Sequence, residues 1–115
     1  MRDPISDLAR VQHIMGAILE IEQYLTNAGL EEFKANSMLR YACVKQLEII
    51  GEAANHLSQR FTTLYNEIEW KDIVRFRNIL VHEYFDIDVK TVWEILQIDI
   101  PPLKTNVSEI LKQLQ

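Results

Sequence analysis

The segment Arg77–Tyr84 contains four polar residue types that can act together on a phosphate ester. Arginine keeps its charge and presents a planar fork of N–H donors, so Arg77 can hold a phosphate. Histidine titrates near neutral pH, so His82 can accept or donate a proton during a reaction. Cleavage of RNA without a metal needs a base for the 2′-hydroxyl, an acid for the leaving oxygen, and cations for the phosphorane. The residue types of this segment therefore permit phosphodiester chemistry.

Wound as a helix, residues 70–82 separate into a polar stripe and an apolar face. The stripe contains four side chains: Lys71, Arg75, Asn78 and His82. Arg77 falls among apolar residues, where an unpaired charge is strongly unfavourable, so it needs a partner or a function. With Lys71 and Arg75 it forms the densest basic cluster of the chain, a candidate to bind RNA phosphates. The residues alone leave two interpretations equally open: a catalytic site, or a helix end finished by Asn78 and His82 with Arg77 in an internal ion pair.

These residues must be held by a helical scaffold, because the sequence contains no strand pattern, repeat or low-complexity segment. Asp3 is predicted to cap a helix that begins at a proline and spans 4–27, and Gly29 is predicted to end it in the left-handed region. Ser37 is predicted to cap a second long helix, whose apolar stripe continues as far as Leu57.

The second long helix has two unusual features. Gly51 lies in its middle and is tolerable there if another helix approaches closely. Its polar face carries four aligned side chains: Tyr41, Glu48, Glu52 and Asn55. This face is either solvated, or one of its two carboxylates meets Arg77 or another cation of the motif.

The rest of the chain is also expected to be helical. Besides the two long helices, three further segments are expected before the last helix. They are a short turn at Leu30–Phe33, an aperiodic connection at Phe61–Glu69, and the motif helix from Trp70. Asp86 and Asp88 offer caps for the last helix, whose apolar spacing continues through Pro101-Pro102, so we expect a kinked helix or two consecutive helices. The predicted fold class is all-α, an antiparallel bundle of four or five helices in a single domain, 1–115.

Composition narrows the possible functions. The net charge of −5 argues against a surface that coats nucleic acid broadly, but it allows a few cations to recognise phosphate locally. A single cysteine excludes an internal disulfide framework and suits a reducing cytosol. No apolar run is long enough to span a membrane, and no signal core follows the N-terminus, so we expect a cytoplasmic protein.

The remaining candidate residues indicate no metal or cofactor. His13, His56 and His82 are scattered and form no ligand motif, and one cysteine cannot build a zinc site. Cys43 lies on an apolar stripe and is assigned to the core rather than to a nucleophile. His56 is expected to make a favourable contact with the end of its helix and no more.

The motif resembles the Arg-x4-His-x-Tyr signature of HEPN-domain toxins, and it reads Arg77-Asn78-x-Leu80-Val81-His82-x-Tyr84-Phe85. More closely, the chain resembles the HepT family, the ribonuclease halves of HepT/MntA toxin–antitoxin pairs, over nearly its whole length. Further matching blocks are Leu47–Ala54, Trp70 and Val92–Ile95 with Leu103. Departures are Arg75-Phe76, where family members often have Gly-Met, and Asn66 and Glu69, where they often have proline.

The resemblance implies an all-helical homodimer whose two protomers contribute arginine and histidine to a shared cleft. It implies metal-independent endoribonuclease activity with Arg77 and His82 as the catalytic pair and Asn78 as a supporting polar group. It also implies an MntA-like minimal nucleotidyltransferase antitoxin that attaches AMP to Tyr84. The rival interpretation is a non-catalytic helical dimer that binds or regulates a nucleotidyltransferase; the net charge favours this rival slightly.

Overall fold

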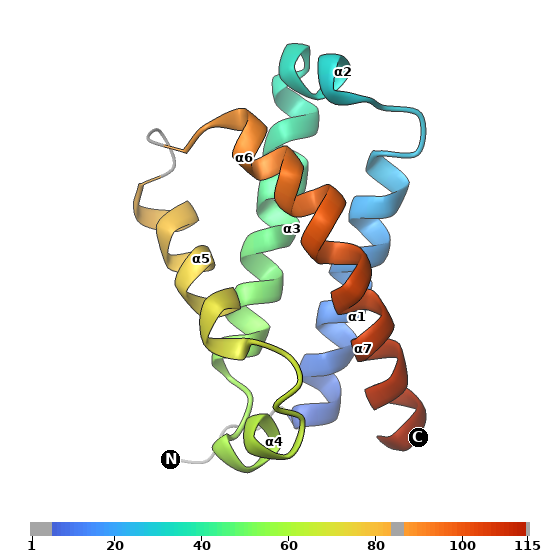
Figure 1. Cartoon of the computed structure of the whole chain (residues 1–115), viewed down its shortest axis with the longest axis vertical. Helices are drawn as coiled ribbons and strands as arrows, with labels where there is room; N and C mark the ends of the chain where they lie inside the picture. The colour runs from blue at the N-terminus through green and yellow to red at the C-terminus, as the bar shows by residue number, and fades with distance from the viewer. Residues whose placement is uncertain (1–5, 84–86, 115) are drawn as a thin grey trace.

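The computed structural model describes residues 6–83 and 87–114, and all regular structure in these residues is helical. Four long elements run alternately up and down: α1 (Asp7–Tyr24), α3 (Ser37–Asn55), α5 (Trp70–His82) and the continuous α6–α7 segment (Figure 1). The predicted all-α antiparallel bundle is therefore confirmed. The connections from α1 to α3 and from α3 to α5 each contain a further short helix.

The first helix is shorter at both ends than predicted. Ser6 has an extended backbone, and its side chain accepts a hydrogen bond from the Ala9 N–H at 3.1 Å, so the helix begins at Asp7. The predicted helix start at residue 4 is wrong, because Ser6, closer to the first apolar turn, satisfies the free N–H group. The predicted cap, Asp3, lies outside the described residues. The helix ends at Tyr24, and three turn residues follow it.

Gly29 does not take the left-handed conformation predicted for it. Its φ is −100°, and it is the N-cap of a further short helix, α2 (Leu30–Ala35), at the place where only a turn was expected. Its N–H donates to Glu32 Oε2 at 3.3 Å, and Phe33 anchors the helix in the core.

The N-terminal caps of α3 and of the next short helix differ from the prediction. Asn36, not Ser37, caps α3, with its Oδ1 accepting from the Leu39 N–H at 3.1 Å. Both residue types cap helices well, so sequence spacing did not separate them. Ser58 caps α4 (Gln59–Leu64), which occupies part of the connection predicted to be aperiodic.

The C-terminal segment confirms the expectation of a kinked helix or two consecutive helices, because a π-helical turn interrupts an otherwise continuous helical segment. Asp88 caps α6 (Val89–Glu94), a π-helical turn η2 (Ile95–Asp99) follows, and α7 (Ile100–Leu114) completes the chain. Pro101 and Pro102 lie in the first turn of α7, where the missing N–H groups disturb the helix least. The alternative cap, Asp86, lies outside the described residues.

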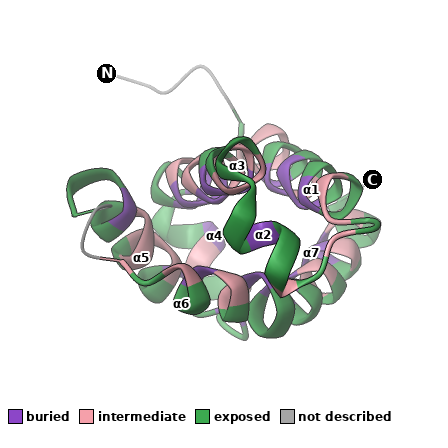
Figure 2. Cartoon of the chain, turned by 90° about the horizontal axis from the view of Figure 1, so that it is seen from above, coloured by how far each residue is buried: buried purple, intermediate pink, exposed green. Residues whose placement is uncertain are grey.

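The core is built from apolar stripes of α1, α3 and the α6–α7 segment, whose buried faces turn inward in Figure 2. Its fully enclosed side chains include Val11, Ile14, Ile18, Phe33, Cys43 and Val107. Helix α5 lies at the edge of the bundle and packs mainly against α3. Most of α5 is therefore accessible, with only Trp70 and Leu80 buried.

Candidate active site

Helix α5 has the bounds predicted for the motif helix and is anchored at both ends. The buried Trp70 side chain donates its indole N–H to the Tyr65 carbonyl oxygen at 3.0 Å. In the last turn of the helix, Leu80 is almost completely enclosed. These two apolar anchors fix the rotation of the helix, so that the polar stripe turns to solvent and Arg77 turns toward α3.

The closest approach of α5 to α3 occurs at Gly51. A Cβ atom built on this glycine would overlap Cβ and Cγ of Arg77 and would contact the Ile73 carbonyl oxygen. The aliphatic stem of Arg77 therefore lies directly on the backbone of α3. The prediction that this mid-helix glycine marks a close helix approach is confirmed.

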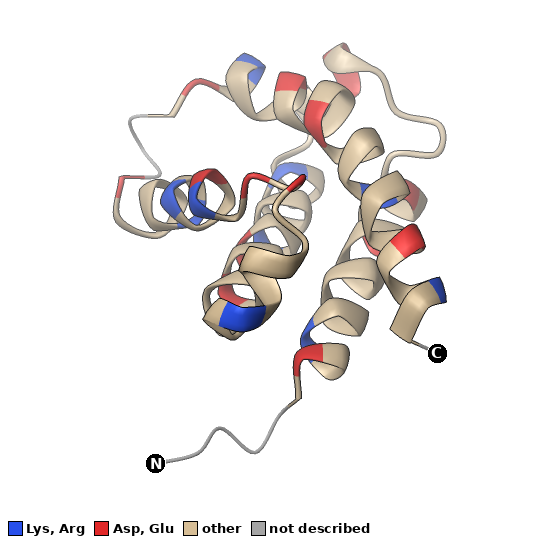
Figure 3. Ribbon diagram, turned by 60° about the horizontal axis from the view of Figure 1, so that its bottom comes forward, with Lys and Arg blue, Asp and Glu red and all other residues tan. Residues whose placement is uncertain are grey.

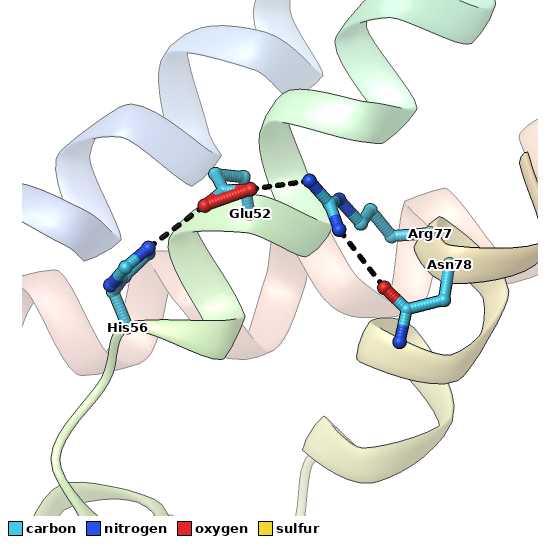
Figure 4. Close-up of polar contacts among 4 residues, drawn as sticks. All are labelled: Glu52, His56, Arg77 and Asn78. Carbon is cyan, nitrogen blue, oxygen red and sulfur yellow. Dashed lines mark hydrogen bonds and ion pairs between the residues drawn. The ribbon is translucent and has the colours of Figure 1, made fainter. Parts of the chain in front are cut away.

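The guanidinium of Arg77 then meets the residue that follows this glycine. Its Nη2 donates to Glu52 Oε2 at 2.6 Å, and its Nη1 donates to Asn78 Oδ1 at 3.0 Å (Figure 4). The Arg77 side chain is 25% exposed and that of Glu52 is 45% exposed. Of the two carboxylates considered from the sequence, Glu52 is the one that pairs with Arg77.

Arg77 keeps donors for an anion after these contacts. A guanidinium has five N–H groups, and the two bonds just described use one on each terminal nitrogen. The Nε–H is buried without a partner among the described residues. One N–H on each terminal nitrogen remains, on a side chain that solvent still reaches. The group can thus hold a phosphate oxygen without breaking either existing bond.

His56 extends the same network on the other side of Glu52. Its Nε2 lies 2.8 Å from Glu52 Oε1, and because an ionised carboxylate only accepts, the imidazole N–H donates here. Figure 4 shows Glu52 between His56 and Arg77. The expectation that His56 does no more than contact the end of its helix is wrong. The signal for this contact was its spacing of four residues from Glu52 on α3.

The four residues predicted to share a polar stripe, Lys71, Arg75, Asn78 and His82, are all exposed on α5. Arg75 pairs with Asp72 at 3.1 Å, so part of its charge is locally balanced. Asn78 lies one turn before His82 and also contacts Arg77, so it connects the stripe to the Glu52 network. Tyr84, the predicted modification site, lies outside the described residues.

Arg77 and His82 do not share one face of α5. Five residues of an α-helix correspond to a rotation of about 140°. Arg77 is directed toward α3, whereas His82 is exposed on the last turn. The described contacts bring Arg77 together with Asn78, Glu52 and His56, and they include none that joins Arg77 to His82 within the described chain.

A separate cavity lies between α3, α5 and the start of α7. It has a volume of about 450 Å³ and an apolar floor that includes Ile50 and Phe76. Its polar lining residues are mainly acidic: Glu67, Glu69, Asp72 and Asp99, with Asn106. Figure 3 shows acidic residues in the segment that leads into α5 and mixed charges along the helix. The cavity lacks a lining lysine or arginine, so it is a poor site for phosphate.

Other chemistry finds little support in the described residues. Within residues 6–83 and 87–114, no three His, Cys, Asp or Glu side chains are grouped to hold a metal ion. Cys43 is fully enclosed, which confirms its place in the core, and burial raises the pKa of its thiol to about 11. A thiol with so high a pKa is a poor nucleophile at neutral pH. None of the described helices is long and apolar enough to cross a membrane.

Comparison with known proteins identifies relatives along most of the chain. A family described as ribonuclease HepT-like matches residues 14–110. A "Probable ribonuclease HepT" of Thermococcus cleftensis is 34% identical over 102 residues, which cover 89% of this chain and 93% of the relative. A "Putative RNase" of Methanocaldococcus jannaschii is 36% identical over 94 residues, covering 82% and 86% of the two chains.

A third relative is longer. The "Gamma-glutamylcyclotransferase and putative RNase" of Methanocaldococcus jannaschii is 36% identical over 104 residues, and the match covers 90% of this chain but 47% of that protein. The chain thus spans about half the length of this relative. No solved structure matches the chain significantly.

Proposed function

We propose, because the chain belongs to the HepT-like ribonuclease family, that it is a metal-independent endoribonuclease with Arg77 and His82 at its active site. The observation that carries this proposal is the state of Arg77. Its guanidinium is held between Glu52 and Asn78, yet its side chain is 25% exposed and keeps N–H donors that these two bonds do not use. The same helix carries an exposed polar stripe that ends at His82. Phosphodiester cleavage requires a pre-oriented cation and a proton-transfer group at the same phosphate, and Arg77 and His82 are the side chains of α5 suited to these two roles.

In the proposed reaction, the 2′-hydroxyl of the RNA attacks the adjacent phosphorus and the 5′-oxygen of the next nucleotide leaves. A neutral histidine removes the 2′ proton, and a protonated histidine supplies a proton to the leaving oxygen. Arg77 stabilises the negative charge that grows on the non-bridging oxygens. Lys71 and Arg75 bind neighbouring phosphates and orient the strand.

One histidine per chain does not easily serve as acid and base at once, so we propose a two-fold homodimer that brings two copies of His82 to one cleft. Two features of α5 support this. Arg77 and His82 diverge around the helix axis, and two apolar side chains near them, Ile79 and Val81, are 37% and 42% exposed. A second copy placed over this end of α5 would cover them.

The same proposal includes control by a partner, an MntA-like minimal nucleotidyltransferase antitoxin. In this step the Tyr84 hydroxyl attacks the α-phosphorus of ATP, a phosphodiester forms, and pyrophosphate leaves. The attached AMP adds bulk and negative charge beside a site that depends on cations, so RNA is repelled. The chain would then act as a toxin in the cytoplasm, where RNA and ATP are both present.

The deciding experiment is cleavage of RNA by the purified, unmodified protein in the presence of a chelator. We expect His82→Ala and Arg77→Ala to lose cleavage and His13→Ala, which changes an exposed histidine on α1, to keep it. The His82 variant should retain the helicity and melting temperature of the wild type. Unchanged cleavage by His82→Ala would overturn the assignment.

A second candidate function is a non-catalytic partner of a nucleotidyltransferase. The net charge of −5 and the acidic lining of the cavity between α3, α5 and α7 favour it, since both disfavour RNA. In that case the unmodified protein leaves RNA intact but binds the nucleotidyltransferase. The same cleavage assay, combined with co-purification of the two proteins, separates the candidates.

A further inference from the structure

We infer that Glu52, held from its other side by His56, is a positioning residue that sets the orientation of the Arg77 guanidinium for phosphate. This inference rests on the proposed function, because it assigns a role to Glu52 in the same site. Three observations carry it: the 2.6 Å bond from Arg77 to Glu52, the 2.8 Å contact from His56 to Glu52, and the absence of a Cβ at Gly51.

The first step concerns how many ways Arg77 can point. An arginine side chain has several rotatable bonds and loses much conformational freedom when it is fixed. Here the stem lies on the backbone of Gly51, and the terminal nitrogens are bound by Glu52 and Asn78. Contacts at three places along the side chain define the plane of the guanidinium. The remaining N–H groups are therefore aimed before any substrate arrives.

The second step concerns what holds Glu52. A glutamate on a helix surface samples several rotamers, and its side chain is 45% exposed. One oxygen binds Arg77 on α5, and the other accepts from His56 one turn along α3. Because the two contacts involve different oxygens of the Glu52 carboxylate, they restrict the rotation of this carboxylate group. Among the contacts of the described residues, the route from His56 to Arg77 runs through Glu52.

The third step asks whether the pair is merely structural. Partly exposed ion pairs contribute little to folding stability, since water screens them and ordering two long side chains costs entropy. The chain contains a close match in Glu22–Lys104, which joins α1 to α7 at 2.9 Å, with exposed fractions of 46% and 38%. If both pairs only stabilised the fold, removing either would have a similar small effect. Positioning predicts that only the Glu52 pair affects cleavage.

The test compares Glu52→Gln with Glu22→Gln. Both changes keep the shape of the side chain and remove its charge. We expect Glu52→Gln to lower kcat by roughly tenfold to a hundredfold with KM changed less than about threefold, since misorientation affects the transition state most. Glu52→Asp keeps the charge and should recover part of kcat. Glu22→Gln should cleave like the wild type, and both glutamine variants should keep the wild-type melting temperature within a few degrees.

Two further variants test the route of the effect. His56→Ala should lower kcat by about threefold, because Glu52 keeps one of its two restraints. Arg77→Lys keeps a charge but lacks the planar fork. In that background Glu52→Gln should cause no additional loss, because the group that it orients is absent. A full additional loss there, or wild-type kcat in Glu52→Gln, would overturn the inference.

Failure of the proposed function is distinguished by a measurement that needs no cleavage. If the wild-type protein leaves RNA uncut, the proposed function is wrong, and positioning is judged by NMR of the Arg77 Nε–H. This group is buried in the wild type, so it should give a sharp, slowly exchanging signal, identified by its loss in Arg77→Lys. Glu52→Gln should broaden or shift that signal, whereas Glu22→Gln should not. An unchanged signal in Glu52→Gln would refute positioning.

Discussion

The stem of Arg77 lies so close to the backbone of Gly51 that no side chain larger than hydrogen fits between the two helices. The atoms that a Cβ would strike are Cβ and Cγ of Arg77, near its own backbone, and these cannot move without moving α5. The glycine therefore determines the distance between α3 and α5, and through it the reach of Arg77 to Glu52.

We predict that Gly51→Ala both destabilises the protein and lowers cleavage. Alanine improves helix propensity by about 1 kcal/mol, but the overlap with Arg77 forces the helices apart at a cost of about 1–3 kcal/mol. Chemical denaturation should show a net loss of stability, and kcat should fall because the guanidinium is displaced.

The matched control for this change is Gly16→Ala on α1. No atom lies within 4 Å of a Cβ built there, so the helix-propensity gain is unopposed and stability should rise. Gly51→Ala more stable than wild type, with unchanged cleavage, would show that α5 moves aside without consequence for the site.

Much of the helix pattern and one contact of the site were predictable from residue spacing. The apolar periodicity predicted the body of each long helix, and the helical wheel placed Arg77 among apolar residues. It placed Glu52 on a polar face that was expected to be either solvated or paired with a cation of the motif, and the second alternative is the one observed. Apolar periodicity is a property of many residues together, so a single exceptional residue does not change the helix that it predicts. An arginine among apolar residues needs a carboxylate, and the polar face of α3 offered two.

The helix ends and the role of His56 were not predictable in the same way. A cap depends on one hydrogen bond, and neighbouring serine, asparagine and aspartate residues compete for it, as at Ser6 and Asn36. His56 was judged by its position at a helix end, although its distance of one turn from Glu52 also permitted a side-chain contact. Whether His56 contacts the helix end or the Glu52 side chain depends on where Arg77 holds Glu52. That position is set by the packing of α5 on α3, which residue spacing within α3 does not reveal.

We predict that Cys43 is inert in the folded protein. The thiol is fully enclosed, and burial raises its pKa to about 11, so almost no thiolate is present at about pH 8. Iodoacetamide should leave the native protein unlabelled and should label it in denaturant. Rapid labelling of the native protein would show that α3 opens locally around this residue.

The same burial predicts a loss of stability in alkaline solution. The folded thiol keeps its proton to about pH 11, whereas the unfolded thiol ionises near pH 9.0, so the unfolded state gains stability as pH rises between these values. Stability should fall by up to about 1.4 kcal/mol per pH unit in this window from this group. Other groups also titrate in this pH window. The quantity to measure is therefore the slope of unfolding free energy against pH in the wild type and in Cys43→Ala. The slope should be shallower in Cys43→Ala.

We predict that Tyr84→Phe remains an active ribonuclease that its antitoxin cannot silence by modification. The phenyl ring lacks the hydroxyl that would attack ATP, whereas Arg77 and His82 are unchanged. Intact-mass measurement after incubation with the nucleotidyltransferase and ATP should show added AMP on the wild type only. AMP on the Phe variant, or silencing that persists in it, would place the regulatory site elsewhere.

We predict that the protein sediments as a dimer at micromolar concentration and that Ile79→Asp shifts it toward monomer. A charge introduced beside the proposed two-fold axis is buried in the dimer without a partner, which is strongly unfavourable. The control is Ile98→Asp, which changes an apolar side chain that is 63% exposed on a different element, the π-helical turn η2. This variant should still sediment with the mass of a dimer. A wild-type monomer that cleaves RNA would contradict the shared site.

The last prediction asks whether one site draws residues from both chains. Arg77 and His82 diverge by about 140° around α5, so the proposed cleft pairs the arginine of one protomer with the histidine of its partner. Arg77→Ala and His82→Ala homodimers should each be inactive, but a heterodimer formed by mixing them retains one Arg77 and one His82. Because the proposed reaction uses one His82 as the base and the other as the acid, this heterodimer lacks one of them, and mixing should restore little cleavage even after mass measurement shows that heterodimers have formed. Cleavage restored to about half the wild-type rate would show that one His82 is sufficient, and would contradict the proposal that both copies act in one cleft.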